Sequence, residues 1–484
     1  MTFNSFEFLL FYPVVLLLYF ILPRKARWPM LLVASYFFYA FYSPELVILI
    51  FLTTLVSWVS SRLMERTESL AKRRLLLALT LVVSLGVLFF YKYFDFLSVS
   101  IFRALGLFGV QADPVLLNLV LPVGLSFYTF QTLSYAIDVY RGDVKSEPNF
   151  FFYALFVSFF PQLFAGPIER PDNLIPQLKA EHKWSREDAV KGAKHMLVGF
   201  FKKICVADLI SGAVNAVFSS PGEQGSLAIA LAAILFCVQI YCDFSGYTDI
   251  AIGCARIMGI RLMKNFDHPY TATSIADFWS RWHISLSSWL RDYLYIPLGG
   301  NRCSTPRHLF NLFFVFLVSG IWHGAAWTFV IWGAIHGLYR IVGSLTQKPR
   351  AALVARLGYD EKSAPVVWVR RVITFALVAF AFIFFRAGSI SDAITLICRM
   401  FSFTAGAQGL LGSMDLTVTR LLLIAASIAV LIIIDRLLRY EDTDDGSDLL
   451  VRHGSFVYLT WCVLIVWALL LSQDMISTFI YFQF

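Results

Sequence analysis

Long apolar runs alternate with short polar stretches along most of the chain. The first run, within "MTFNSFEFLLFYPVVLLLYFIL", has no basic residue before it and no A-x-A site after it, so it does not read as a cleavable signal. The basic stretch "PRKARW" follows, which predicts an anchor helix with its N-terminus outside. The same charge rule places 42–46 outside and 61–74 inside. It predicts an outward helix from Leu75 to about Phe96 and an inward helix over about 115–138.

Beyond residue 150 the apolar runs are less regular. Some are shorter than the ~20 residues that span a bilayer, and some are broken by Gly or Pro, which is typical of re-entrant elements. We expect an all-α polytopic membrane protein with roughly 10–13 membrane helices, including re-entrant and interfacial ones, at ~20 residues per crossing. No second domain fits between the runs, so 1–484 is expected to form a single transmembrane domain. The later runs lie near 151–166, 195–218, 226–258, 309–339, 368–386, 418–435 and 454–473.

Composition and charge agree with this class of protein. Hydrophobic residues make up 58% of the chain and charged residues 15%, against roughly 25% charged residues in soluble domains. The net charge of +8 lies mainly between apolar runs, which indicates contact with the lipid bilayer and no nucleic-acid partner. The seven cysteines form no C-x-x-C pair, so they are interpreted as small apolar residues. Only Cys242, within "YCDFSGY", is kept open as an exception.

The stretch 264–308 is too polar to span a membrane and too aromatic for an ordinary loop. Within it, "ADFWSRWHISLSSWLRDYL" predicts one amphipathic helix, with Ser274 or Asp277 as its N-cap. Its tryptophans and arginines suit a helix lying at the membrane interface. That role leaves His283 unexplained, because His283 is not needed to anchor the helix.

Two further stretches place acidic residues beside apolar runs. "YCDFSGYTDIAIG" contains Asp243 and Asp249, whose spacing of six residues is not that of a helical pair, so they need not meet. A structural role, such as capping a broken helix or bracing an arginine, is favoured over catalysis. "FPQLFAGPIERP" ends an apolar run in prolines, a Gly-Pro turn, Glu169 and Arg170, which predicts a re-entrant hairpin that shapes a cavity.

The run "GIWHGAAWTFVIWGAIHG" carries His323 and His336 among three tryptophans. An uncompensated charge in such a run costs several kcal/mol, so each imidazole must find a partner or stay neutral. A neutral imidazole is a competent general base toward a hydroxyl or a thiol. Trp322 would wall such a site, and Gly324 would let substrate approach the backbone. No metal site is predicted, since at ~100° per residue the two histidines lie more than 120° apart on one straight helix.

Several familiar catalytic motifs are absent from the sequence. It contains no G-x-S-x-G elbow, no P-loop, no H-x-x-x-x-D and no H-E-x-x-H motif. A single histidine in a membrane run is evenly balanced between a structural and a functional role. Two of them, His283 and His323, each beside a tryptophan, favour function.

These segments together resemble the membrane-bound O-acyltransferase (MBOAT) family, in particular its bacterial branch of alginate O-acetyltransferases. The resemblance follows the same order over residues 1–484 and implies the family's fold around a central tunnel. It implies that His323 is the catalytic histidine and His283 the second polar position, which is Asn, Asp or His in the wider family. The role of His336 stays open, with packing as the default; Trp322, Trp279 and Asp243 would support the tunnel. The motifs are "LPVGLSFYTFQTLSYAIDVYRGD", "FPQLFAGPIERP", "DFSGYTDIAIG", "FWSRWHISLSSWLRDYLYIPLGGNR", "GIWHGAAWTFVIWGAIHG" and "FIYFQF".

The resemblance also implies a reaction in the bacterial inner membrane. Acetyl-CoA, or an acyl carrier thioester, would be the donor substrate, with no permanently bound cofactor. The acyl group would reach His323 and leave on the outer side, onto an SGNH-type periplasmic acetyltransferase partner or directly onto an alginate-like exopolysaccharide. Whether His323 is transiently acylated or acts only as a base is left open. The residues considered for the donor's phosphates are Lys202, Lys203, Arg256, Arg261, Lys264 and Arg302.

Three alternatives remain at this point. D-alanyl transfer to teichoic acid would use a carrier-protein donor and the same histidine, and peptidoglycan or cellulose acylation would differ only in the acceptor. The non-enzymatic alternative is a transporter or channel with intramembrane histidines as a proton relay. Transporters commonly contain paired inverted repeats, and no such repeat is visible in this sequence.

Overall fold

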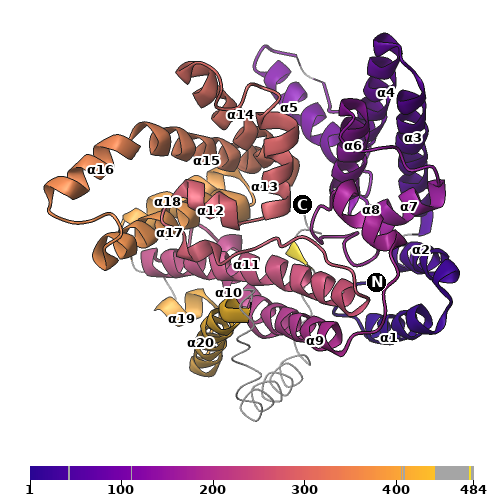
Figure 1. Cartoon of the computed structure of the whole chain (residues 1–484). Helices are drawn as coiled ribbons and strands as arrows, with labels where there is room; N and C mark the ends of the chain where they lie inside the picture. Colours follow the sequence, from indigo (N-terminus) through magenta and orange to yellow (C-terminus); the bar gives the residue numbers. More distant parts are fainter. Residues whose placement is uncertain (42–43, 111, 405, 407–408, 442–478, 481–484) are drawn as a thin grey trace. The chain divides into compact units, whose positions relative to one another are not determined.

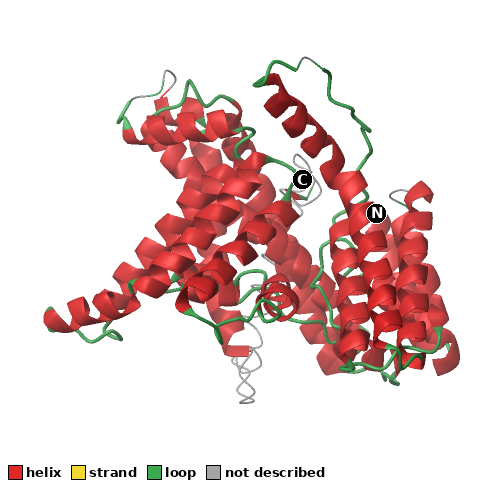
Figure 2. Cartoon of the chain, turned by 90° about the horizontal axis from the view of Figure 1, so that it is seen from above, coloured by secondary structure: helices red, strands yellow, loops and turns green. Residues whose placement is uncertain are grey.

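The structure is a computed structural model that describes most of the chain. It leaves out residues 42–43, 111, 405, 407–408, 442–478 and 481–484, and the side chains of 436–441. The described residues form helices joined by turns and loops, with no β-strand among them (Figure 2). The predicted all-α class is confirmed. The predicted run at 454–473 and most of the terminal "FIYFQF" lie outside the described residues.

The described helices fall into two compact units that alternate along the chain. Two helices, α9 (Arg186–Phe200) and α11 (Ser226–Ile257), contribute residues to both units. The predicted single transmembrane domain over 1–484 stays a prediction. The first unit consists of residues 1–196 and 250–264, and the second of residues 197–249 and 265–484.

Helices of the first unit bury small polar side chains and expose large apolar ones. Helix α3 buries Thr54, Ser57 and Ser61, whereas Ile48 and Leu52 on the same helix are exposed. Small side chains let helix backbones approach closely in a membrane, and lipid covers exposed apolar faces. Helices α3, α4 and α6 pack together (Figure 1). The first unit contains α1 (Phe6–Ile21), α2 (Arg24–Ala40), η1 (Pro44–Leu46), α3 (Val47–Arg66), α4 (Leu70–Leu88), η2 (Phe89–Tyr93), α5 (Phe94–Gly106), α6 (Leu125–Arg141), α7 (Phe150–Ser158) and α8 (Pro171–Lys179).

The helix predicted over about 115–138 is wrong in its first half. Residues 112–124 are irregular, and α6 begins only at Leu125, after Gly124 in a left-handed conformation (φ +79°). Pro122 lacks the N–H of a helix interior, which explains the late start. The carboxylate of Asp95 accepts hydrogen bonds from the backbone N–H groups of Leu117 (2.7 Å) and Asn118 (3.0 Å), and these bonds satisfy part of the irregular backbone.

The second unit is built around helices that are interrupted rather than straight. In the part of this unit that the structure describes, π-helical turns interrupt the helices at η3 and η5, and such turns often occur at functional sites. Helices α14 and α15 pack closely against each other. The helices of this unit are η3 (Phe201–Asp208), α10 (Leu209–Ser219), η4 (Pro269–Thr271), α12 (Ile275–Arg281), α13 (Ile284–Leu290), η5 (Arg291–Tyr295), α14 (Thr305–His323), α15 (Trp327–Leu345), α16 (Gln347–Arg356), α17 (Ala364–Arg386), α18 (Ile390–Phe401), α19 (Gly409–Ser413) and α20 (Val418–Glu441).

Long apolar helices make the chain a multi-pass membrane protein. Within the described residues, five helical stretches are long and apolar enough to cross a bilayer, and Phe6–Ile21 is a shorter apolar helix. The predicted total of 10–13 membrane helices also counts re-entrant and interfacial helices, so that number stays a prediction, as does the orientation of each helix. The five stretches are Pro44–Arg66, Leu70–Gly106, Ser226–Ile257, Ala364–Arg386 and Val418–Asp435.

Candidate active site

His323 is the last residue of α14, where the predicted run 309–339 is broken. The chain is extended at Gly324 and becomes helical again at Trp327. A Cβ atom at Gly324 would collide with the ring of Phe329, so the close approach that this glycine permits is made by Phe329 rather than by substrate. The side chain of His323 is 4% exposed. The break therefore fixes a buried imidazole at a helix C-terminus, where the helix dipole favours a positive charge.

His283 lies in a break between α12 and α13. The prediction of one continuous amphipathic helix is wrong here, because His283 has a left-handed backbone (φ +46°, ψ +54°). Helical spacing continues across this break, so the sequence pattern does not reveal it. The predicted N-cap is confirmed at Ser274, whose hydroxyl accepts a hydrogen bond from the backbone N–H of Asp277 (3.1 Å).

Asn265 stabilises this break and was not singled out from the sequence. Its backbone carbonyl accepts the N–H of Ile284 (2.9 Å). Its side-chain Oδ1 accepts the backbone N–H (3.3 Å) and the hydroxyl (3.0 Å) of Ser285, and lies 3.1 Å from Nδ1 of His283. Asn265 is fully buried. It therefore orients the His283 ring, and a lone Asn in a loop gave no periodic signal that could have identified it.

The two helix breaks bring His283 and His323 together within the second unit. Their ring centroids lie 6.4 Å apart, at an interplanar angle of 61°. Trp322 contacts both rings, with centroid distances of 5.9 Å to His283 and 5.0 Å to His323. Other aromatic rings enclose the pair: Phe244 at 4.7 Å from His283, and Trp332 at 5.0 Å and Phe385 at 5.4 Å from His323.

His336 belongs to a neighbouring aromatic cluster rather than to this pair. The indole Nε1 of Trp279 donates a hydrogen bond to its Nδ1 (3.2 Å). Trp332 lies 4.9 Å from the His336 ring and 5.0 Å from the His323 ring, so it contacts both histidines. His336 lies on α15, whereas His323 ends α14. The sequence analysis placed His323 and His336 on one straight helix when it argued against a metal site, and that placement is wrong. The contacts of His336 with Trp279 and Trp332 are those of a packed side chain, the role expected of it.

Lys202 and Lys203 are buried in ion pairs in η3. Lys202 lies 2.9 Å from Asp249 and 3.6 Å from Asp435, and Lys203 lies 2.8 Å from Asp208 and 2.7 Å from Asp243. Both lysines are 5–6% exposed. A buried ammonium needs such a partner, so this geometry favours a structural role for both. Their contact with the donor's phosphates stays a prediction.

Asp243 connects Lys203 to the end of the described chain. Its Oδ1 accepts from the ammonium of Lys203, and its Oδ2 accepts from the backbone N–H of Ile480 at 2.7 Å. Asp243 therefore pairs with a lysine and not with the arginine considered from the sequence, and its structural role stays a prediction. Cys242 beside it is fully buried among apolar residues.

The other basic candidates lie in more exposed positions. Arg256 belongs to the first unit, where its Nε lies 3.4 Å from Asp188 and its side chain is 24% exposed. Arg302 is exposed in the turn that precedes α14. Their role in donor binding stays a prediction, and Arg261 and Lys264 also belong to the first unit.

The segment "FPQLFAGPIERP" forms a buried turn after α7, whereas its prediction as a re-entrant hairpin that shapes a cavity stays a prediction. The carboxylate of Glu169 accepts hydrogen bonds from the backbone N–H of Met263 and from the side-chain amide of Asn173 (2.7 Å). Burial raises the pKa of Glu169 to about 7, although these two hydrogen bonds oppose that shift. The Glu169 carboxyl group therefore connects α8, which carries Asn173, to the segment after α11 that contains Met263.

Comparisons with known proteins show which family the chain resembles, and the roles of the individual site residues stay predictions. A family model described as "MBOAT, membrane-bound O-acyltransferase family" matches residues 140–385, which include all three histidines discussed above. A "Probable alginate O-acetylase AlgI" of Pseudomonas putida is 36% identical over 505 residues, covering 100% of both chains. One with the same description from Pseudomonas aeruginosa is 40% identical, covering 83% of this chain and 75% of the relative. A "Peptidoglycan O-acetyltransferase" of Helicobacter pylori is 34% identical, covering 81% of this chain and 77% of the relative.

Proposed function

The chain belongs to the membrane-bound O-acyltransferase family, and we propose that it exports acetyl groups from cytoplasmic acetyl-CoA for O-acetylation of an alginate-like exopolysaccharide. It is an O-acyltransferase of the membrane, so the predicted transporter alternative is not adopted. The acetyl group and the glycan are supported by the relatives described as alginate O-acetylases, which align over most or all of the chain. We place the reaction in the bacterial inner membrane.

The pair of His283 and His323 is the observation that carries the proposed chemistry. A centroid distance of 6.4 Å lets one small group, such as a hydroxyl or a thioester carbonyl, contact both rings. His323 takes the proton of the attacking group as general base. The C-terminus of α14 stabilises the imidazolium that results. The oxygen of the attacking hydroxyl forms a bond to the carbonyl carbon of the acyl group as the C–S bond of the donor breaks. The imidazolium of His323 then gives the proton to the leaving thiolate, which departs as the thiol.

The proposal also includes an acyl donor on the cytoplasmic side and a partner protein on the periplasmic side. Acetyl-CoA, or a carrier thioester, supplies the acyl group, and the exposed Arg302 is more accessible to its phosphates than the buried, ion-paired Lys202 and Lys203. Arg256 is half-buried and paired with Asp188 in the first unit, and it remains a further candidate. An SGNH-type periplasmic acetyltransferase then passes the acetyl group to the polysaccharide acceptor. The central tunnel that joins the two sides of the membrane remains part of this proposal.

Peptidoglycan is the second candidate acceptor. The Helicobacter pylori relative is described as a peptidoglycan O-acetyltransferase, and its alignment covers most of this chain. D-alanyl transfer has less support, because a "Teichoic acid D-alanyltransferase" of Bacillus subtilis is 30% identical but aligns with only 46% of this chain.

The proposal is tested by expressing the chain in alginate-producing cells without their own O-acetylase. Ester-linked acetate is released with mild alkali from purified alginate and from peptidoglycan, and D-alanine esters are measured in parallel. We expect acetate on alginate, and a decrease of about 10²–10⁴-fold for His323→Ala, the size of a general-base contribution.

The matched control is His308→Ala, because His308 lies near the other end of the same helix. It should leave acetylation within about two-fold. A stably inserted His323→Ala protein that still acetylates would refute the catalytic role of His323. Acetate found on peptidoglycan and absent from alginate would instead refute the proposed acceptor.

A further inference from the structure

The first unit contains a cavity of about 330 Å³ beside the end of α1 and the beginning of α2. Four basic residues line it: Arg24, Lys25 and Arg27 from α2, and Lys179 from the end of α8. Trp28 and Phe152, which stack at 4.4 Å, and several apolar residues line the rest of it. Basic side chains around an enclosed volume favour an anionic ligand.

Only part of this positive charge is compensated. The ammonium of Lys179 pairs with the buried carboxylate of Glu147. Arg24 lies 3.9 Å from Glu181, but both side chains are more than half exposed, so this pair is weak. Among the residues that the structure describes, no carboxylate lies within ion-pair distance of Lys25 or Arg27. The cavity therefore has two positive charges available to a ligand.

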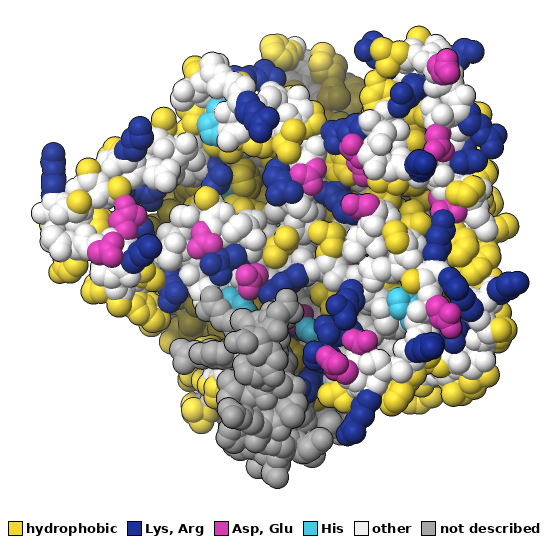
Figure 3. Space-filling view, viewed as in Figure 1, with side chains coloured by type: hydrophobic (Ala, Val, Ile, Leu, Met, Phe, Trp, Pro, Cys, Tyr) yellow, Lys and Arg dark blue, Asp and Glu magenta, His cyan; other side chains and the backbone are white. Residues whose placement is uncertain are grey.

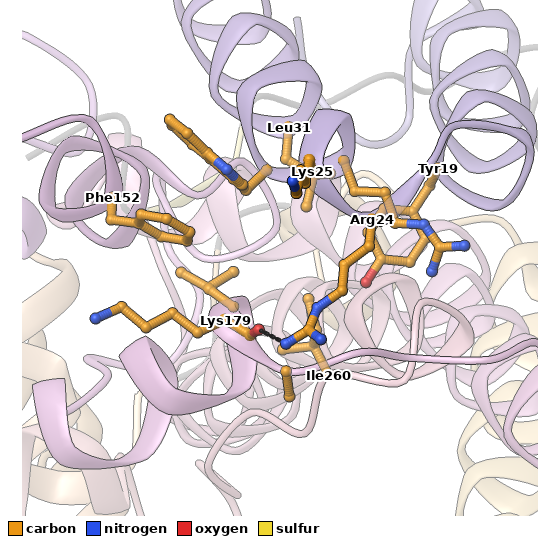
Figure 4. Close-up of a pocket in the computed structure, with 11 residues that line it drawn as sticks. Tyr19, Arg24, Lys25, Leu31, Phe152, Lys179 and Ile260 are labelled. Atoms are coloured by element: carbon orange, nitrogen blue, oxygen red, sulfur yellow. Dashed lines mark hydrogen bonds between the residues drawn. The ribbon is translucent and has the colours of Figure 1, made fainter. Parts of the chain in front are cut away.

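The guanidinium groups are held in place before any ligand binds. Arg27 donates hydrogen bonds from Nε to the carbonyl of Leu22 (3.1 Å) and from Nη1 to the carbonyl of His182 (2.6 Å), and lies 5.3 Å from the ring centroid of Tyr19. Arg24 reaches across the cavity and donates from Nη2 to the carbonyl of Lys179 (3.1 Å), as Figure 4 shows. Fixed donors lose little side-chain entropy when an anion binds.

The position of the cavity indicates the source of the anion. Leu17 and Ile21, on the last turns of α1, are 61% and 69% exposed, so an uncovered apolar face ends one turn before the basic residues. Figure 3 shows hydrophobic side chains along the edge of the first unit and charged side chains on the face toward the viewer. A phospholipid has acyl chains that can cover the apolar face of α1 and a phosphate that can bind the basic residues next to it. A soluble phosphate compound has no acyl chains and would leave the apolar face uncovered.

We propose that this cavity binds the phosphate ester of an anionic membrane phospholipid, with Lys25 and Arg27 as its charge partners. The acyl chains of the same lipid cover the exposed face of α1. This lipid site does not depend on the acyl-transfer function, and it assigns a ligand to a part of the chain that the histidine pair does not use.

The test uses the full chain in detergent and native mass spectrometry with added phosphatidylglycerol or phosphatidylcholine. We expect wild-type protein to retain phosphatidylglycerol preferentially. The double variant Lys25→Gln/Arg27→Gln should retain it about 25-fold less, since each basic residue near a membrane surface contributes about five-fold. The matched control is Lys72→Gln/Arg74→Gln, which removes the same charge from exposed residues of α4 outside the cavity. It should stay within about two-fold of the wild type.

Binding of coenzyme A and of inorganic phosphate is measured in the same way, to separate a soluble phosphate ligand from a lipid. Unchanged retention of phosphatidylglycerol by Lys25→Gln/Arg27→Gln, or an equal loss in the control, would overturn the proposal. Binding of coenzyme A that requires Lys25 and Arg27, without a preference for phosphatidylglycerol, would also overturn it and assign the cavity to a soluble phosphate. If the double variant is not helical and monodisperse, Lys25→Gln alone is measured against Lys72→Gln, with about a five-fold loss expected.

Discussion

The imidazole rings of His283 and His323 lie 6.4 Å apart, centroid to centroid, although forty residues separate them in the chain. Each residue stands where a helix is broken: His283 directly before α13, and His323 at the end of α14. The backbone at these breaks, rather than helical periodicity, determines how the rings face each other. Substitutions that alter a break are therefore expected to change activity even without removing an imidazole.

The left-handed backbone of His283 restricts what can replace it. A left-handed conformation costs most residues about 1–2 kcal/mol, whereas Asn tolerates it. We expect His283→Asn to be more stable than His283→Val by about 1–2 kcal/mol and to keep more of the acyl transfer, because its amide is polar. Thermal unfolding in detergent measures the difference. The same two substitutions at helical His308 should differ by less than ~0.5 kcal/mol, and an equal difference at both positions would contradict the role of the backbone.

Asn265 is expected to act as a positioning residue for His283. Asn265→Ala removes the oxygen that accepts the backbone N–H and the hydroxyl of Ser285 and that lies beside Nδ1 of His283. An unpaired buried donor costs about 1–3 kcal/mol. The substitution should therefore lower acyl transfer about ten-fold and shift the pH profile of acyl transfer. Asn301→Ala, at an exposed turn residue, is the control. A loss of stability with an unchanged pH profile would show that Asn265 is only structural.

The contact between α14 and α15 requires glycine. A Cβ atom at Gly333 would lie 2.5 Å from the carbonyl oxygen of Phe316 and 3.0 Å from Cα of Gly320. Gly333→Ala should therefore push the helices apart, destabilise the protein by about 1–3 kcal/mol and reduce activity by displacing His323. Gly343→Ala on the same helix meets no atom within 4 Å and should be neutral or stabilising by up to ~1 kcal/mol. Equal unfolding temperatures for the two variants would exclude this packing constraint.

Lys203 offers a direct test between a structural role and a role in donor binding. Lys203→Met leaves Asp208 and Asp243 buried without their ammonium, which should cost about 3–5 kcal/mol and lower the amount of folded protein in the membrane. Lys191→Met, which removes a lysine from an exposed pair with Glu187, should change stability by less than ~1 kcal/mol. If Lys203→Met folds normally and only raises KM for acetyl-CoA, the donor-binding prediction is correct instead.

Glu169 should make stability depend on pH. Its pKa rises to about 7 in the folded chain from an ordinary value of 4.5, so the folded state holds a proton that the unfolded chain releases between these values. Stability should therefore fall as pH rises from about 4.5 to 7, by about 3 kcal/mol in total. Unfolding temperatures across this range should decline less steeply for Glu169→Gln than for the wild type. Exposed Glu187→Gln is the control, and parallel slopes in all three proteins would exclude Glu169 as the cause.

The apolar runs predicted most long helices of the described chain, because burial in lipid needs uninterrupted apolar length. The breaks were not predictable in this way. Helical spacing continues through His283 although the helix does not, and the run around Gly324 stays apolar on both sides of its break. The helix start near residue 115 was also wrong, since an apolar irregular segment has the same composition as a helix.

The structure adds geometry to the candidate site that the sequence does not contain. His283 and His323 were both singled out from the sequence, but only the fold shows that their rings lie within contact distance of the same tryptophan. Asn265 was missed because its role depends on contacts with residues 18 to 20 positions away. The burial of Lys202 and Lys203 is equally invisible in a sequence, where a basic pair near a helix end suggests an exposed surface.

The hydrogen bond from the backbone of Ile480 to Asp243 has a consequence for biogenesis. The ribosome adds Ile480 237 residues after Asp243, by which time helix α11, which carries Asp243, has long left the exit tunnel. Until then the second carboxylate oxygen of Asp243 must be satisfied in another way, and Phe479 is missing from its place against Phe244 and Tyr247. Phe244 in turn contacts His283. A nascent chain therefore completes the surroundings of its histidine pair only after Ile480 has been added, and ribosome-bound intermediates that lack Ile480 should be inserted yet inactive.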